Sequence, residues 1–225
     1  KIKKKNSNKY ILFLHGMAQN INDYQDLYEA IINQGDYGIL ALEYRAYGEN
    51  IKGNPTEDNL LKDTKNGFKY LLNKQINPED IIVAGHSMGG SIATSFASKQ
   101  KKLKSLLLIC PLTKTEYLGK KFLKNSQLGM GVPNFVQNLT EKCKPLKWLY
   151  SMVFNSIDRI KNVKCQTFLI HSRNDTVTTL QGARNFVKTA TRNNVPIEYY
   201  YPLAGGHKVD QRKIEIITEI LNNLK

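Results

Sequence analysis

The sequence feature that most constrains the fold is the segment Gly-His-Ser-Met-Gly-Gly at residues 85–90, which directly follows the apolar run Ile81–Ala84. A G-x-S-x-G pattern between a predicted strand and a predicted helix is typical of a tight turn that lifts the serine hydroxyl above the edge of a parallel sheet. Side chains at Gly85 and Gly89 would block the close approach of helix to strand in this turn. Ser87 is therefore the predicted nucleophile, and residues 85–90 are called the elbow below.

Short apolar runs alternate with helical patterns along most of the chain. The predicted strands cover residues 10–14, 38–42, 81–84, 103–109, 166–170 and 197–201. The predicted helices cover residues 23–34, 57–72, 88–99, 178–191 and 211–224, the second of them capped by Thr56. This alternation favours an α/β fold with a mostly parallel, doubly wound sheet that is covered on both faces. A chain of 225 residues fits a single domain over residues 1–225.

One segment, residues 112–155, breaks this rhythm with several glycines and prolines, and we expect it to be a lid insertion over the sheet edge. Its apolar side chains either line an acyl-binding pocket or pack the lid onto the sheet, and the sequence leaves both readings open. These side chains are those of Leu118, Phe122, Leu123, Met130, Val132, Phe135, Trp148, Leu149, Met152 and Phe154.

The chain is strongly basic, with a formal net charge of +14 at pH 7 and a pI of about 9.6. Its lysines are spread along the sequence, without an arginine-rich helix or a nucleic-acid motif. We therefore expect no nucleic-acid partner, whereas a peripheral contact with an anionic membrane stays open. The cysteines, Cys110, Cys143 and Cys165, lack CxxC or Cys/His spacing, so the sequence predicts neither a metal site nor a disulfide framework.

The sequence also bears on location. No stretch reaches the roughly 18 apolar residues of a membrane helix, and no signal peptide is visible. The chain opens on Lys1 without an initiator methionine, so we expect a fragment of a longer protein. The expected location is the cytoplasm, or a membrane reached through an upstream segment that this chain lacks.

A serine needs an adjacent base to act as a nucleophile, and the chain offers four histidines. His15 precedes the loop after an early strand, His171 ends a later strand, and His86 lies inside the elbow, where we expect its side chain to point away from the serine's reactive face. His207 lies in a glycine-rich loop between the last predicted strand and helix, and it fits the chain order Ser, Asp, His. His207 is therefore the predicted base.

A third group must orient the imidazole and stabilise its charge. Asp175 follows the predicted strand 166–170 and so lies at the carboxyl edge of the sheet; its alternative role is to cap the next helix. Asp210 is a rival, but it lies three residues from His207 and is expected to start the last helix. Asp158, in a linker, is a weaker rival. Asp175 is the predicted acid.

The oxyanion of a tetrahedral intermediate needs two hydrogen-bond donors. One is the backbone N–H of Met88, directly after the serine and at the start of a helix. We assign the other to the backbone N–H of Met17, because Gly16 lets the chain turn tightly after the first predicted strand.

Five segments together resemble the α/β-hydrolase-fold serine hydrolases, and the likeness extends over nearly the whole chain. The segments are Leu14–Gly16, Tyr44–Gly48, Gly85–Gly90, His171–Asp175 and Gly206–His207. The elbow is similar to that of monoacylglycerol lipases and serine aminopeptidases, whereas Tyr44–Gly48 and residues 155–160 look more like the small-lid branch with palmitoyl-protein thioesterase-like enzymes. The resemblance implies a Ser87–Asp175–His207 triad and an eight-stranded, mostly parallel sheet. It also leaves Arg45 a structural role, tying loops together.

These observations predict a serine esterase, lipase or thioesterase that forms an acyl-enzyme on Ser87 and needs no cofactor or metal. The expected substrate is a small-molecule or lipid acyl compound. An aminopeptidase-like peptidase is the alternative, but it would need an acidic cluster in the lid, and residues 112–155 contain only Glu116 and Glu141. A non-catalytic binding protein on the same fold is a further alternative, which the intact set of triad residues disfavours.

Overall fold

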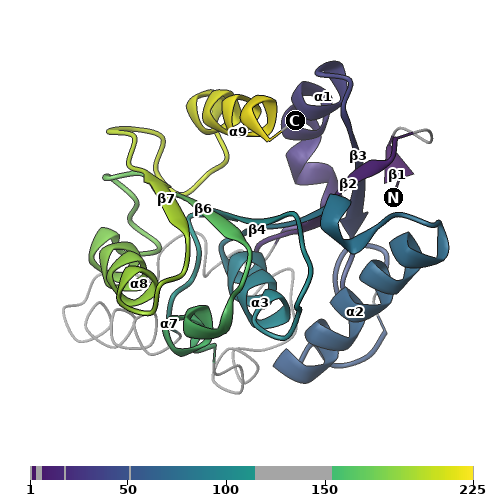
Figure 1. Ribbon diagram of the computed structural model, residues 1–225, viewed down its shortest axis with the longest axis horizontal. Helices are drawn as coiled ribbons and strands as arrows, with labels where there is room; N and C mark the ends of the chain where they lie inside the picture. The colour runs from purple at the N-terminus through teal and green to yellow at the C-terminus, as the bar shows by residue number, and fades with distance from the viewer. Residues whose placement is uncertain (1, 4–6, 18, 51, 115–153, 225) are drawn as a thin grey trace.

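A seven-stranded sheet runs through the described part of the molecule, and its order is β1-β3-β2-β4-β5-β6-β7 (Figure 1). The computed structural model describes residues 2–3, 7–17, 19–50, 52–114 and 154–224. The strands are β1 (Ile2–Lys3), β2 (Lys9–Leu14), β3 (Tyr37–Leu42), β4 (Ile81–His86), β5 (Ser105–Ile109), β6 (Gln166–Ile170) and β7 (Ile197–Tyr200). Only the β1–β3 pair is antiparallel in this sheet; the other described neighbours are parallel.

Helices cover both faces of the sheet (Figure 1). They are α1 (Gln25–Asn33), α2 (Glu57–Asn73), α3 (Met88–Ala97), α7 (Ser156–Arg159), α8 (Leu180–Arg192) and α9 (Gln211–Asn223). Short 3-10 turns cover Ile21–Tyr24, Pro78–Asp80 and Ile160–Asn162. Figure 1 shows α1 and α9 on one side of the sheet and α2, α3, α7 and α8 on the other.

The strands are buried on both faces because successive side chains point to opposite sides of a strand. In β2, Leu12 and Leu14 join the cluster with α2, α3 and α8, whereas Ile11 and Phe13 join the cluster with α1 and α9. All four side chains are almost completely buried. This burial on both faces explains why the strands read as continuous apolar runs in the sequence.

The observed architecture confirms the predicted α/β class and the parallel sheet. Thr56 caps α2 by accepting a hydrogen bond from the Asn59 N–H at 3.3 Å. Arg45 links the loop after β3 to α2 through three hydrogen bonds to the carboxylate of Asp63, two from its guanidinium and one from its backbone N–H, as expected for a residue that ties loops together.

Two expectations differ from the structure or lie beyond it. The described residues form seven strands, one fewer than the eight that the resemblance implies, and β1 supplies the antiparallel edge. Of the predicted lid, only residues 112–114 and 154–155 are described, so the predicted role of its apolar side chains, Phe154 apart, lies outside the described residues. Phe154 itself is buried in the core. We keep the division into one domain with a lid as a proposal.

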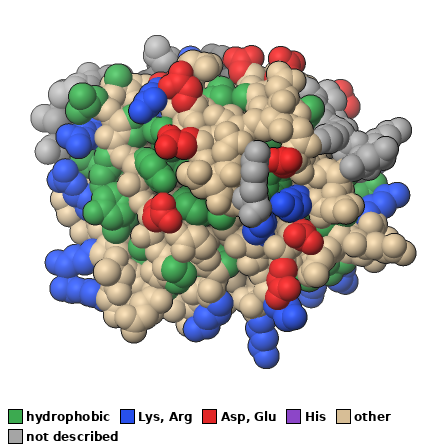
Figure 2. Space-filling model, turned by 45° about the horizontal axis from the view of Figure 1, so that its top comes forward, with side chains coloured by type: hydrophobic (Ala, Val, Ile, Leu, Met, Phe, Trp, Pro, Cys, Tyr) green, Lys and Arg blue, Asp and Glu red, His purple; other side chains and the backbone are tan. Residues whose placement is uncertain are grey.

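Charged side chains are dispersed over the surface. On the face shown in Figure 2, Lys and Arg side chains lie mostly along the margins, and Asp and Glu side chains lie across the middle and upper part of the face. The high net charge therefore does not gather into one basic patch on this face. Within the described ranges, every helix falls short of the length or the apolar character that a bilayer crossing needs.

Candidate active site

Ser87 lies between β4 and α3 in a backbone conformation that side chains seldom adopt, with φ 54° and ψ −117°. The surrounding backbone holds this turn in place. The Ser87 N–H donates to the carbonyl of Ile109 at 2.9 Å, and the Ser87 carbonyl accepts from the N–H groups of Gly90 and Leu112, each at 3.0 Å. Ser87 is therefore fixed by its own backbone hydrogen bonds, at the carboxyl end of a central strand.

The glycines of the elbow are required by contact between backbones. A Cβ atom on Gly89 would overlap the carbonyl oxygen of Leu14 in β2, and one on Gly85 would overlap the carbonyl of Gly89. Because these neighbours are backbone atoms of packed elements, they cannot turn away as a side chain could. These overlaps agree with the expectation from the sequence that side chains at Gly85 and Gly89 would block the close approach of helix to strand.

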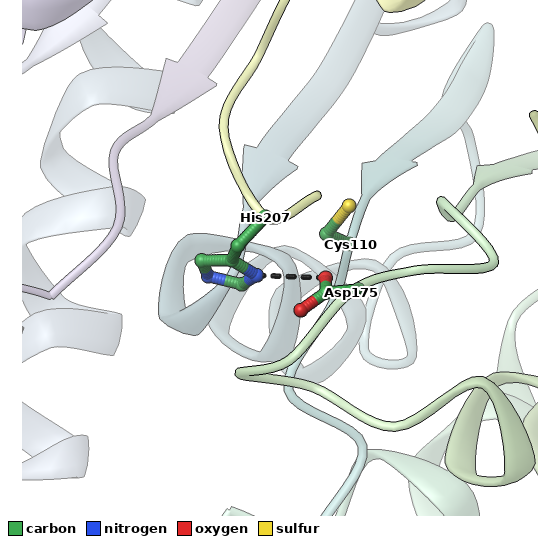
Figure 3. Close-up of side chains that lie close together, drawn as sticks. All are labelled: Cys110, Asp175 and His207. Atoms are coloured by element: carbon green, nitrogen blue, oxygen red, sulfur yellow. Dashed lines mark hydrogen bonds and ion pairs between the residues drawn. The ribbon is translucent and has the colours of Figure 1, made fainter. Parts of the chain in front are cut away.

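A continuous line of hydrogen bonds joins Ser87, His207 and Asp175. His207 Nε2 lies 2.9 Å from Ser87 Oγ, and His207 Nδ1 lies 2.8 Å from Asp175 Oδ2. Figure 3 shows the second of these contacts, with the imidazole facing the carboxylate. Since a carboxylate only accepts hydrogen bonds, Nδ1 carries the proton, and Nε2 is left with a lone pair toward the serine hydroxyl. The geometry is that of a nucleophile, a base and an orienting acid.

Asp175 is buried and ionised. Burial by itself raises the pKa of its carboxyl, but the hydrogen bond and the charge of His207, with hydrogen bonds from Thr178 and Val177, outweigh burial and hold the pKa below its usual range. Oδ1 accepts from the N–H groups of Val177 at 2.7 Å and Thr178 at 3.0 Å, and Oδ2 accepts from the Thr178 hydroxyl at 2.8 Å. The carboxylate thus orders its own loop through both oxygens and also accepts from His207 with Oδ2. Helix α8 is capped by Thr179 instead.

The rival acids lie elsewhere. Asp210 caps α9 by accepting from the Lys213 N–H at 3.2 Å, and it pairs with the buried Lys213 ammonium at 3.1 Å. Asp158 lies in α7 and pairs with Lys161 at 2.9 Å. Neither carboxylate is recorded in contact with His207 in the described structure.

The two remaining histidines outside the elbow, His15 and His171, contact residues other than Ser87. His15 Nε2 lies 3.0 Å from Glu43 Oε1, and the His15 ring packs against Tyr44 and Tyr47. His171 Nε2 contacts the Thr178 hydroxyl at 3.1 Å. Both histidines are completely buried, so His207 is the histidine that reaches Ser87.

The predicted oxyanion donors flank Ser87. Met88 opens α3, and the N–H groups in the first turn of a helix have no partner within the helix. The loop that carries Met17 passes close to the serine, since a Cβ atom on Gly16 would lie 3.3 Å from the Ser87 Cβ. The structure therefore brings both segments to Ser87, and their role as donors stays a proposal.

His86 is the residue whose surroundings sequence reasoning missed. Its side chain reaches the backbone carbonyl of His207 at 2.7 Å and the Tyr24 hydroxyl at 2.8 Å. Burial, with a smaller contribution from the charge of His207, lowers the pKa of His86 to about 3. No local pattern reveals these contacts, because the partners lie 121 and 62 residues away.

One group of potential metal ligands occurs in the described part of the chain, formed by Cys110, Asp175 and His207 (Figure 3). Their ligand atoms lie within 4.8 Å of one another. Burial raises the pKa of the Cys110 thiol to about 12, so the thiol is protonated, and a thiol binds metals as the thiolate. Asp175 and His207 already satisfy each other, and we read Cys110 as a packing residue beneath them.

Comparison with known proteins gives the same picture of the fold. A family model described as "Serine aminopeptidase, S33" matches residues 5–150. A multifunctional-autoprocessing repeats-in-toxin of Vibrio cholerae is 38% identical over 92 residues, which are 40% of this chain and only 2% of that protein. A lipase-esterase related protein from Clostridium acetobutylicum has a TM-score of 0.77 at 17% identity, over 99% of this chain and 96% of that one. The Pyrococcus furiosus esterase Pf2001 has a TM-score of 0.72 at 23% identity, over 97% and 80%.

Proposed function

Because this chain belongs to the serine aminopeptidase S33 family of α/β hydrolases, we propose that it is a serine hydrolase that cleaves the ester or thioester of an acyl substrate. The observation that carries the proposal is the line of contacts from Ser87 through His207 to Asp175, at 2.9 Å and 2.8 Å. The strained backbone of Ser87 supports it, since such strain clusters at functional sites.

The first half-reaction forms an acyl-enzyme. Ser87 Oγ attacks the substrate carbonyl carbon while its proton passes to His207 Nε2, and a C–O bond forms. The carbonyl oxygen takes up the negative charge, and the N–H groups of Met88 and Met17 are the proposed donors to it. When the tetrahedral intermediate collapses, the bond to the leaving oxygen or sulfur breaks, and His207 returns the proton to that atom.

The second half-reaction releases the acid. His207 Nε2 takes a proton from water, the resulting hydroxide adds to the acyl carbon, and collapse expels Ser87 Oγ, which recovers its proton from His207. In both halves His207 carries a positive charge for a moment. The ionised Asp175 stabilises that charge, and the groups named here together with water account for every atom and proton.

The names of similar proteins support an acyl substrate of small-molecule or lipid type, because two of the solved structures are an esterase and a lipase-esterase related protein. A peptidase is the second candidate, and the name of the family favours it. Residues 112–155 contain only two acidic residues, Glu116 and Glu141, to hold a substrate amine, which supports the ester reading.

Labelling with a fluorophosphonate probe tests the proposal. We expect the wild-type chain to be labelled on Ser87 and the Ser87→Ala variant to remain unlabelled, with His171→Gln as a control for the loss of a buried polar side chain. A series of p-nitrophenyl esters of increasing acyl length, run beside aminoacyl p-nitroanilides, then separates an esterase from an aminopeptidase. Labelling that survives Ser87→Ala would overturn the nucleophile, and faster hydrolysis of the anilides would favour the peptidase.

A further inference from the structure

A buried polar cluster behind Ser87 takes no part in the reaction steps above. It consists of the His86 imidazole, the Tyr24 hydroxyl, the Gln19 carboxamide and the backbone N–H of Gly16. We infer that His86 is a positioning residue, which sets the place of His207 relative to Ser87 and to the Gly16–Met17 loop. The inference rests on the proposed function, because it concerns the same site.

The first contact fixes the backbone of the base. His86 Nε2 lies 2.7 Å from the carbonyl oxygen of His207, and a carbonyl only accepts, so Nε2 carries the proton and donates it. His86 directly precedes Ser87 in the chain. A single hydrogen bond therefore ties the backbone that carries the nucleophile to the backbone that carries the base.

The second contact reaches the predicted oxyanion loop. With its proton on Nε2, His86 presents a lone pair at Nδ1, which lies 2.8 Å from the Tyr24 hydroxyl oxygen. That oxygen in turn accepts from the N–H of Gly16 at 2.9 Å. Gly16 is the neighbour of Met17, so the imidazole connects three segments: the elbow, the loop of His207 and the loop of Met17.

Gln19 completes the cluster when the oxygen and the NH₂ group of its carboxamide are assigned from their hydrogen-bond partners. The Tyr24 hydroxyl has one proton but faces two acceptors, His86 Nδ1 at 2.8 Å and Gln19 Oε1 at 2.6 Å. A half-turn of the carboxamide exchanges its oxygen and its NH₂ group, which crystallographic density also seldom distinguishes. The NH₂ group then donates to the Tyr24 oxygen, and Tyr24 donates its proton to His86 Nδ1.

His207 needs such an anchor because of the loop that carries it. Gly205 and Gly206 precede it with φ of 105° and 54°, in the left-handed region, and the whole segment 201–210 is exposed or half-buried. Apart from Tyr201 and Val209, which pack against the hydrophobic clusters, the loop has little buried surface, so individual hydrogen bonds matter more for its position.

At Gly206 and His207 the backbone is held by a hydrogen bond from the Gly206 N–H to Asn174 Oδ1 at 2.9 Å, by one from His86 to the His207 carbonyl at 2.7 Å, and by a longer contact of 3.9 Å from the Cys110 thiol to the Gly206 carbonyl. Arg173 donates to the carbonyls of Tyr201 and Pro202 at the start of the loop.

The neutral state of His86 suits this place. The His86 and His207 rings lie 4.9 Å apart between centroids, so a charge on His86 would oppose the charge that His207 gains during the reaction. Complete burial keeps His86 uncharged at neutral pH. The imidazole therefore holds the base by a neutral hydrogen bond.

Substitutions at His86 separate its two contacts. His86→Gln places an NH₂ group near the position of Nε2 and keeps the donor to His207, whereas His86→Asn can reach only the position of Nδ1. We expect kcat to fall by about tenfold or less in the Gln variant, as for one lost hydrogen bond. We expect about a hundredfold loss in the Asn and Ala variants, as for a base displaced by about 1 Å. KM should stay within about twofold in all three, because none of them contacts the substrate.

Tyr24→Phe gives a second route to the same test. It removes the hydroxyl that joins His86 to Gly16, and we expect kcat to fall by about tenfold. Tyr37→Phe is the matched control: it removes another buried tyrosine hydroxyl, bonded to the Leu224 carbonyl at 3.3 Å and away from this cluster. Thermal unfolding of each variant shows whether a loss of activity reflects a loss of fold.

The outcomes distinguish a failure of the proposed function from a failure of the positioning role of His86. If the wild-type chain neither hydrolyses p-nitrophenyl acetate nor labels with the fluorophosphonate at Ser87, the proposed function fails. If the wild type does both, and folded His86→Ala retains wild-type kcat, His86 is not a positioning residue. Equal losses in the Gln and Asn variants would also overturn the inference, because the donor to His207 would then have no separate effect.

Discussion

The proposed nucleophile and the proposed base are held in place by different means. Residues 81–97, which form β4, the elbow and α3, are buried at every position except Ser87. The loop of His207, residues 201–210, is exposed or half-buried throughout. In the first region, contact between backbones leaves no room for a Cβ atom at Gly85 or Gly89; in the second, a Cβ atom on Gly206 would meet nothing within 4 Å.

The surroundings of Ser87 therefore tolerate less structural change than those of His207. The serine is placed by steric packing of the elbow together with its own backbone hydrogen bonds, and the packing tolerates almost no change, because packed interiors respond even to a single added methylene group. The imidazole is placed by a small number of hydrogen bonds: Asp175 accepts from His207, Asn174 accepts from the Gly206 N–H, and His86 donates to the His207 carbonyl. The first kind of placement is readable from glycine spacing in a sequence; the second is not.

The largest expected effect comes from removing the reacting atom while leaving both regions intact. Ser87→Ala should lower kcat for p-nitrophenyl acetate by about a million-fold, as for loss of a serine nucleophile. The free energy of unfolding in urea should change by less than about 0.5 kcal/mol, since the side chain is half-buried and alanine adds no bulk. Residual activity within about a hundredfold of the wild type would mean that another group attacks the substrate.

The next effect tests the link between the two regions. Asp175→Asn should lower kcat by about 10⁴-fold, because an amide NH₂ group would donate to His207 and force its proton onto Nε2, away from Nδ1. Asp210→Asn is the control, since Asp210 caps α9 and is not recorded in contact with His207. A similar loss of kcat in both variants would contradict the assignment of the acid.

A matched glycine pair makes the comparison quantitative. Gly89→Ala should destabilise the chain by about 3 kcal/mol or more, because its Cβ atom would overlap the Leu14 carbonyl oxygen. Gly206→Ala should cost only about 1 kcal/mol, the strain of alanine at φ 54° in open space. Urea unfolding of both variants measures the difference, and equal values would contradict the division into a packed region and a hydrogen-bonded region.

The smallest expected effect concerns pH. The pKa of His86 is about 3 in the folded chain and about 6.5 when unfolded, so between these values the unfolded chain binds a proton that the folded chain does not. Stability from this residue is fully present above about pH 6.5 and falls as the pH is lowered, by up to about 1.4 kcal/mol per unit. His86→Gln lacks this titration, so the difference in unfolding free energy between it and the wild type should shrink or reverse from pH 7 to pH 4.5.

A difference between the two chains that stays constant over that range would show that His86 is accessible to protons in the folded state. Other titrating groups, such as Asp175 and His171, are common to both chains and largely cancel in this comparison.

Much of the fold could be predicted from the sequence, because the information is local. Apolar runs marked strands such as β2 and β6, Thr56 marked the start of α2, and the spacing of Gly85 and Gly89 marked the elbow. The first turn of α1 was less clear: the predicted helix began at residue 23, whereas a 3-10 turn covers Ile21–Tyr24 and α1 starts at Gln25.

The parts of the site that escaped prediction depend on contacts distant in the sequence. Asp175 was weighed as either an acid or a helix cap, whereas its carboxylate bonds both to His207 and to the loop at residues 177–178. His86 was assigned an orientation but no partner, because its partners are a carbonyl oxygen and a tyrosine on other elements. Such contacts follow from how loops meet above the sheet, which periodicity does not record.

The most direct test of the account is to trap the acyl-enzyme. Wild-type chain mixed with p-nitrophenyl acetate should release a burst of about one equivalent of p-nitrophenol per chain before the steady state, if deacylation is the slower step. Peptide mapping by mass spectrometry after an acid quench should then find the acetyl group on Ser87. An acetyl group on any other residue, or the same acetylation and turnover in Ser87→Ala, would contradict the account.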